Sequence, residues 1–231
     1  MSRRTHDDLV HELARDLRPV RPIASLRVTA VKLLALWLGA VGVSGVLRGG
    51  LPSLGADTSS GQLLHWSILV GLAILAGGAL LAACASVVPG RDRVARASRA
   101  VAALGVAWVV GFGLAGIIGD QAAPHAELLA GSFACFGYAI VLGLPSLGMA
   151  AAFLSRGVAA NPRLASGVAA AGTVGLGAFA VHATCPDTGG YHVLLSHCLT
   201  PILAAGLLAL PLAALIVRAS RTESRSLPAN P

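Results

Sequence analysis

The sequence predicts an all-α membrane protein with six transmembrane helices, and three observations support this fold class. Hydrophobic residues make up 55% of the 231 residues and charged residues only 12%, with a mean hydropathy of +0.77. Six apolar stretches are each ~20 residues or longer, which lets a helix cross a ~30 Å hydrocarbon core. When the chain is threaded back and forth, all but one of its 17 Lys and Arg residues fall on one side, which is a strong positive-inside signal.

The six stretches leave little of the chain for anything else. The predicted spans are residues 28–47, 66–88, 98–118, 130–154, 164–184 and 193–217. Residues 1–27 then form a cytoplasmic segment, residues 28–217 the transmembrane domain and residues 218–231 a cytoplasmic tail. The loops between spans are short, so we expect no second folded domain.

The distribution of charge also predicts orientation and location. Arg48 is the one basic residue on the side opposite to both termini. Because Lys and Arg collect in cytoplasmic loops, both termini are expected in the cytoplasm, with the protein in a bacterial inner membrane. The net charge of +7 is then explained by insertion and by contact with anionic membrane lipids, and we expect no direct binding of nucleic acid.

A short amphipathic helix is predicted ahead of the first span, over residues 5–18. Leu9, Leu13 and Leu17 recur at every fourth position and give this helix one apolar face. Pro19 ends it, because proline has no backbone N–H to donate. The polar surface carries four acidic side chains and two arginines, whereas helices that lie on anionic lipid are mostly basic. Docking into a groove on a cytoplasmic protein therefore fits better than anchoring at the membrane surface.

Within the spans, small residues and prolines should shape the packing. Pro145, Pro201 and Pro211 are expected to interrupt or bend their helices. Small residues three or four apart predict close helix contacts in the first, third and fifth spans. These residues are Gly39, Gly42, Gly45, Gly49, Gly111, Ala115, Gly119, Gly167, Ala171 and Gly175. Asp, Glu, Lys and Arg do not occur deep in any predicted span, which disfavours a transporter.

Three of the four cysteines are predicted near the outer face of the membrane: Cys135, Cys185 and Cys198. Cys84 falls near the inner end of the second span, and we expect it to be an apolar packing residue. The periplasm permits disulfides, so the outer thiols could form a redox-active pair, form one static bridge, bind a metal ion or simply pack.

Histidines gather at the same end of the predicted bundle. His182, His192 and His197 surround Cys185 and Cys198 in sequence. Three further residues are expected in the other outer loops: His65, His125 and Glu127. Thiolates and imidazoles bind zinc, copper and similar ions, so these residues could hold a transition metal, although their spacing matches no standard metal motif.

No catalytic constellation is visible in the sequence, so we do not expect an enzyme. Three functions remain open from the residues alone besides docking to a cytoplasmic partner. They are a metal- or heme-handling membrane protein, a small transporter, and a structural subunit without a switch.

Two regions of the chain resemble one known family. Residues 13–20 read LARDLRPV, just ahead of the first span. In the second half, Cys135 early in the fourth span precedes Leu144-Pro145, Arg156-Gly157 and Pro162, and Cys185-Pro186-Asp187 follows the fifth span. In this layout the chain is similar to the NrsF-like negative regulators of sigma factor F, a family of six-span inner-membrane anti-sigma factors.

The resemblance implies that the protein holds an extracytoplasmic-function sigma factor inactive and releases it under stress, such as an oxidant or a heavy metal. The implied sensing thiols are Cys135 and Cys185, and Cys198 is an additional thiol that could pair with Cys185 instead. No cofactor is expected apart from a metal ion at the outer Cys and His residues. The implied sigma-factor-binding residues are Leu13, Asp16, Leu17, Arg18, Pro19 and Val20, to which the apolar helix face adds Leu9.

Overall fold

The computed structural model describes residues 25–48, 50, 60–119, 125–157, 159–187 and 189–226. These residues form long helices and no strand, which confirms the predicted all-α class. The elements are α2 (Leu26–Arg48), α3 (Ser60–Ala85), α4 (Asp92–Gly119), α5 (His125–Leu154), α6 (Pro162–Thr184), α7 (Gly190–Val193), the π-helical turn η2 (Leu194–Cys198) and α8 (Thr200–Ser226). Six helices in the described part are long and apolar enough to cross a membrane, as predicted.

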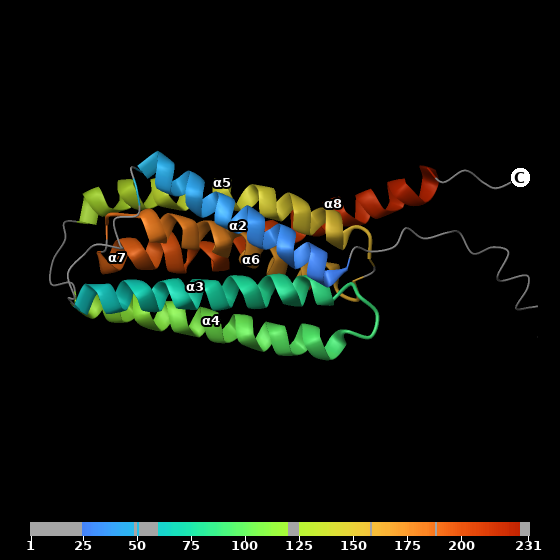
Figure 1. Cartoon of the computed structure of the whole chain (residues 1–231), viewed down its shortest axis with the longest axis horizontal. Coiled ribbons are helices and arrows are strands. Elements are labelled where there is room, and N and C mark those ends of the chain that lie inside the picture. Colours follow the sequence, from blue (N-terminus) through green and yellow to red (C-terminus); the bar gives the residue numbers. More distant parts are fainter. Residues whose placement is uncertain are drawn as a thin grey trace, which may run out of the picture.

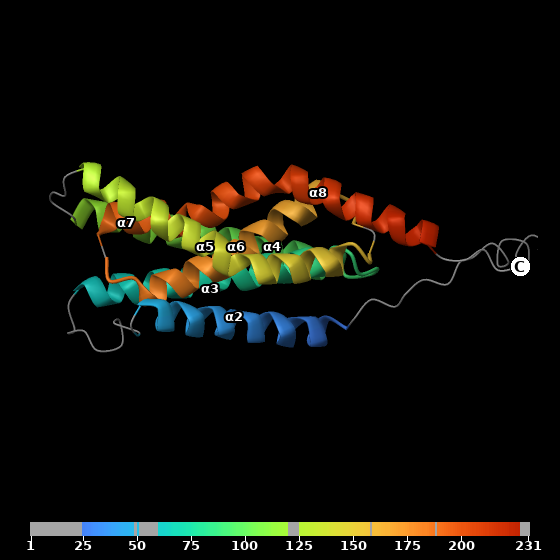
Figure 2. The same cartoon turned by 90° about the horizontal axis from the view of Figure 1, so that it is seen from above.

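The long helices lie side by side along one axis, and α6 is at the centre (Figures 1 and 2). This helix contacts α2, α3, α5 and α8. In its most apolar window 78% of the residues are buried, against 17% in α2 and 22% in α4. The large apolar side chains that α2 and α4 expose are suited to contact with lipid acyl chains.

Small residues explain why α6 can occupy the centre. A Cβ on Gly172 would lie 2.8 Å from the side chain of Leu80 in α3, and a Cβ on Gly177 would overlap the carbonyl of Ala139 in α5. The predicted small-residue face of the fifth span is confirmed, since Gly167 and Gly175 also contact neighbouring helices. By contrast, no neighbouring atom lies within 4 Å of where a Cβ would stand on Gly39, Gly42 and Gly111, because α2 and α4 are peripheral.

The three prolines lie in different surroundings. Pro145 lies inside α5 and Pro211 inside α8. Pro201 is the second residue of α8 and lies three residues after the end of the π-helical turn, where the amide of Leu199 donates to the carbonyl of Leu194. A proline in the first turn of a helix forfeits no hydrogen bond, so the break in the sixth span comes from the π turn.

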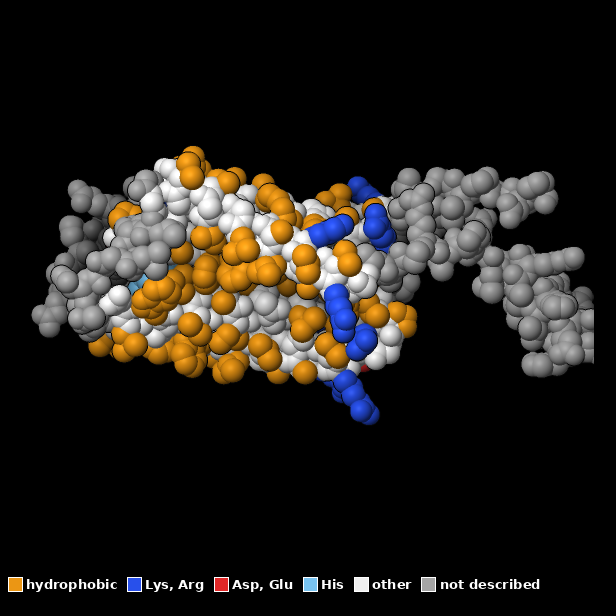
Figure 3. Space-filling model, in the orientation of Figure 1, with side chains coloured by type: hydrophobic (Ala, Val, Ile, Leu, Met, Phe, Trp, Pro, Cys, Tyr) orange, Lys and Arg blue, Asp and Glu red, His pale blue; other side chains and the backbone are white. Residues whose placement is uncertain are grey.

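Basic side chains gather at one end of the bundle, where α2 and α4 begin (Figure 3). We call this the basic end and the opposite end the histidine end. The helices alternate in direction, so the connections α3–α4 and α5–α6 also lie at the basic end. Among the described residues, Arg48 is the exception, because it is the last residue of α2, at the histidine end.

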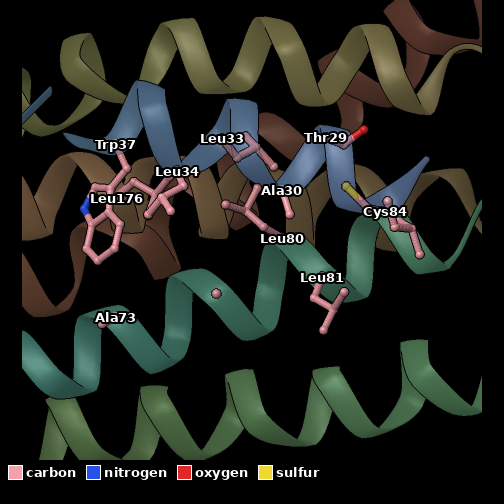
Figure 4. Close-up of a pocket in the computed structure, with 12 residues that line it drawn as sticks. Thr29, Ala30, Leu33, Leu34, Trp37, Ala73, Leu80, Leu81, Cys84 and Leu176 are labelled. Carbon is pink, nitrogen blue, oxygen red and sulfur yellow. The ribbon is translucent and has the colours of Figure 1, made fainter. Parts of the chain in front are cut away.

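An apolar cavity of about 300 Å³ separates part of α2 from α3 (Figure 4). Leu34 and Trp37 of α2 and Leu81 and Cys84 of α3 are among the residues that line it. Cys84 is buried in this apolar region, as expected for a packing residue. Since the cavity leaves α2 without close support from α3 over this stretch, α2 is held mainly by α6 and α5.

Candidate functional site

Two buried thiols meet at the histidine end. Cys135 of α5 and Cys185, which caps the end of α6, place their Sγ atoms 3.8 Å apart, and both thiols are free. Cys185 has an extended backbone (φ −79°, ψ 124°) because the following residue is Pro186, which disfavours a helical conformation before it. The hydrogen bond with Cys135 and burial raise the pKa of the Cys185 thiol.

His192 of α7 joins the thiol pair. Its Nε2 lies 3.4 Å from Sγ of Cys185. Its Nδ1 lies 3.4 Å from Oδ2 of Asp187 and also 3.4 Å from Oγ of Ser132. Asp187 is held in turn, because its Oδ1 accepts a hydrogen bond from the amide of Gly189. The ring of His192 is therefore oriented at one nitrogen by polar neighbours and presents the other nitrogen to sulfur.

The π-helical turn brings a second histidine to the thiols. His197 lies five residues after His192, a separation that would turn the two side chains about 140° apart on a regular α-helix. The π turn η2 includes His197 and begins two residues after His192, and its wider winding changes the direction in which the His197 side chain leaves the helix. One ligand atom from each of Cys135, Cys185, His192 and His197 lies within 4.8 Å of the others, and all four residues are buried.

A row of imidazoles continues from this group into the bundle. The ring of His197 lies 4.9 Å from that of His182, which stacks on His65 at 4.4 Å between centroids. His65 was expected in an outer loop, but it lies in α3 and is buried, because the helix begins several residues before the predicted span. His182 therefore lies beside the group of four and is separate from it. Neither ring nitrogen of His182 or His197 has a hydrogen-bond partner.

The last turn of α2 also contacts this site, and this contact was not predicted from the sequence. Nη2 of Arg48 donates to Sγ of Cys135 at 3.2 Å, and its guanidinium lies 5.3 Å from the ring centre of Tyr138. One turn earlier, the hydroxyls of Ser44 and Thr184 are 2.6 Å apart and buried. In the predicted topology Arg48 is the single basic residue on its side, and that exceptional position was the available signal.

The other predicted site residues do not enter this group. Cys198 is buried, and its Sγ lies 3.3 Å from where a Cβ on Gly113 of α4 would stand. The structure therefore brings Cys185 together with Cys135, and Cys198 faces α4. The predicted sigma-factor-binding residues lie outside the described part of the chain: Leu9, Leu13, Asp16, Leu17, Arg18, Pro19 and Val20.

Comparison with known protein families matched residues 13–219 to the family described as "NrsF: Negative regulator of sigma F". The chain belongs to this family. The match covers most of the sequence and confirms the resemblance seen in the two motif regions. The family description makes NrsF proteins negative regulators of a sigma factor and does not describe a class of enzymes. Comparisons with curated proteins and with solved structures gave no match.

Proposed function

We propose that this protein is an inner-membrane anti-sigma factor that binds an extracytoplasmic-function sigma factor through residues 9–20. The family description names a sigma factor as the regulated protein. The clustering of Lys and Arg at the basic end supports a cytoplasmic position for that end and for both termini. The N-terminal segment would then be on the same side of the membrane as RNA polymerase.

The proposed sensing element is the pair formed by Cys135 and Cys185, and their 3.8 Å separation is the observation that carries this part of the proposal. A disulfide has a sulfur–sulfur bond of about 2.05 Å, so bridging requires the two Sγ atoms to approach by nearly 2 Å, through side-chain rotation together with a shift of the end of α6 against α5. Both thiols lose a proton and together lose two electrons, which pass to the external oxidant. The histidine end would face the periplasm, where disulfides persist.

The proposed route of the signal is helix α2. At the histidine end Arg48 donates to Cys135, and Ser44 contacts Thr184, the residue next to Cys185. Disulfide formation removes the thiol that Arg48 contacts and moves Thr184 with its neighbour. The 23 residues of α2 extend about 35 Å at 1.5 Å per residue, toward the docking segment, which ends six residues before α2 begins. The cavity beside α2 leaves it room to shift or tilt.

The energy needed for such a switch is small. Each ~1.4 kcal/mol of difference between the reduced and oxidised states changes the affinity for the sigma factor about tenfold. The part-buried contact of the Arg48 guanidinium with Cys135 is a hydrogen bond with a charged donor, a class that contributes ~1.5–3 kcal/mol. Loss of the Arg48 contact is therefore of the right size to alter binding by at least tenfold.

Co-purification from native membranes tests the proposal. The full-length protein is isolated before and after a pulse of the thiol oxidant diamide, and bound proteins are identified by mass spectrometry. We expect a sigma factor at rest and at least a tenfold loss after the pulse, with no loss in Cys135→Ser or Cys185→Ser. Cys84→Ser is the matched control, because Cys84 is a buried thiol at the opposite end of the bundle, and it should respond like the wild type.

Three other outcomes separate the parts of the proposal. A sigma factor retained in the wild type after oxidation contradicts the thiol switch and leaves the anti-sigma role. A release that persists in both cysteine variants contradicts the assignment of these two thiols. The absence of any sigma factor under either condition contradicts the proposed function itself.

A further inference from the structure

We propose that Cys135, Cys185, His192 and His197 form a four-ligand site for one thiophilic divalent metal ion, Zn²⁺ or Cd²⁺. Two thiolates and two imidazoles are a donor set that these ions bind in tetrahedral geometry. Ion binding at this site is a property of the protein alone, so the proposal does not depend on the proposed sigma-factor function.

The distances between ligand atoms agree with such a tetrahedron. Two Zn–S bonds of about 2.3 Å at the tetrahedral angle place the sulfur atoms about 3.8 Å apart, and a Zn–S with a Zn–N bond gives about 3.6 Å. The Sγ atoms of Cys135 and Cys185 are 3.8 Å apart, and Nε2 of His192 lies 3.4 Å from Sγ of Cys185. All four ligand atoms fall within 4.8 Å of one another, so only small side-chain adjustments would surround an ion.

The surroundings of His192 match those of a metal-binding histidine. Histidine ligands almost always hydrogen-bond through the second ring nitrogen to a carboxylate, a carbonyl or water, which fixes the ring and its tautomer. In this protein Nε2 faces the sulfur atoms, while Nδ1 lies 3.4 Å from the Asp187 carboxylate. The same carboxylate is fixed by the amide of Gly189. Asp187 would therefore position His192 for binding.

His197 supplies an independent observation. Its side chain is fully buried, yet both ring nitrogens are without a hydrogen-bond partner. An unpartnered buried polar group costs roughly 1–3 kcal/mol, so native structures rarely keep one without a reason. An ion bound to one of these nitrogens would satisfy it. His197 also lies in the π-helical turn, and such turns are frequent at functional sites.

The charges of the proposed site balance. Each thiol loses its proton on binding, so a divalent ion and two thiolates are together neutral and two protons are released. Among the described residues, the charged groups in contact with the ligands are the guanidinium of Arg48 beside Cys135 and the carboxylate of Asp187 beside His192, which are of opposite sign. Metal binding at a buried position therefore leaves no net charge in the apolar surroundings.

Metal titration of the purified full-length protein, reduced and freed of metal with a chelator, tests the proposal. Co²⁺ serves as the spectroscopic probe for Zn²⁺, because tetrahedral Co²⁺ absorbs strongly in the visible range and its thiolate bonds give ultraviolet charge-transfer bands. We expect one Co²⁺ per chain with both signatures, displaced by one equivalent of Zn²⁺ or Cd²⁺. A wild-type spectrum of octahedral Co²⁺, or no bound ion, overturns the proposal without reference to any variant.

Single substitutions test the four ligands. Loss of a residue that only orients a metal ligand weakens metal binding roughly tenfold to hundredfold. Loss of a ligand itself should weaken Zn²⁺ binding by more than this in each of four variants: Cys135→Ser, Cys185→Ser, His192→Phe and His197→Phe. Cys198→Ser and His65→Phe are matched controls, since both residues are buried near the group but contribute no ligand atom. They should retain one ion with wild-type affinity. Equal affinity in the ligand variants and the controls contradicts this ligand set.

Discussion

Nη2 of Arg48 donates to Sγ of Cys135 at 3.2 Å, which joins the last residue of α2 to the thiol pair on α5 and α6. Arg48 is also the single basic residue at the end of the bundle opposite to all the other Lys and Arg residues of the spans and their connections. A basic residue at this end runs against the positive-inside distribution of Lys and Arg. The contact with Cys135 provides a physical reason for an arginine at position 48.

Arg48→Met should separate thiol oxidation from release of the sigma factor. The substitution removes the guanidinium that contacts Cys135 and Tyr138 but retains an apolar stem that packs similarly. We expect the Cys135–Cys185 disulfide to form as in the wild type. The fold loss of bound sigma factor on oxidation should fall to less than about a third of the wild-type fold loss, because ~1 kcal/mol or more of the coupling between oxidation and sigma-factor binding is removed. Maleimide gel shifts and co-purification measure the two steps.

Lys32→Met is the control for this prediction. Lys32 is an exposed basic residue on the same helix, near the basic end. This variant should show normal disulfide formation and normal release. If Arg48→Met behaves in the same way as Lys32→Met, α2 does not carry the signal through Arg48.

Oxidation should join Cys135 to Cys185 before any other pair of thiols. Their Sγ atoms are 3.8 Å apart, whereas Cys198 faces Gly113 of α4 and Cys84 lies at the other end of the bundle. After brief exposure to diamide, disulfide mapping by mass spectrometry should recover the Cys135–Cys185 peptide pair, with Cys198 and Cys84 still alkylated. A first disulfide between Cys198 and Cys185 would contradict the geometry described here.

Gly177→Ala should destabilise the bundle strongly for so small a change. A Cβ on Gly177 would overlap the carbonyl of Ala139, so α5 and α6 would have to move apart. Overpacking of this kind costs roughly 1–3 kcal/mol. Gly148→Ala is the matched control, because no atom lies within 4 Å of where its Cβ would stand, and alanine favours a helix over glycine by about 1 kcal/mol. Thermal unfolding in detergent should show a lower midpoint for the first variant and an unchanged or higher one for the second.

Leu13→Asp combined with Leu17→Asp should abolish binding of the sigma factor. Two carboxylates on the predicted apolar face would have to be buried unpaired in the docking groove, which costs several kcal/mol and at least about a hundredfold in affinity. Arg15→Gln, on the opposite face of the predicted helix, should bind normally. Binding of purified sigma factor to the protein in nanodiscs measures the difference, and equal affinity for both variants would exclude the leucine face as the docking surface.

The thiol pair itself could be expected only in part from the sequence. Alternating transmembrane helices bring Cys135, Cys185 and Cys198 to one end of the bundle, but the axes of packed helices are ~8–10 Å apart, and periodicity does not show which faces meet. The choice of Cys135 over Cys198 as the partner of Cys185 depends on the close packing of α5 on α6 at Gly177 and Ala139. The part played by Arg48 depends on the direction in which the end of α2 leans.

The sequence by itself determined the fold class, the number of spans, the charge asymmetry and the protein family, because each of these depends only on local composition and short motifs. Apolar length predicts a span without knowledge of its neighbours, and the positive charges follow from insertion. Only the tertiary structure decided that two cysteines and two histidines converge while His182 lies beside them. That convergence rests on a π-helical turn, which changes the direction of His197, and on the contact between small residues, which sets the distance between helices.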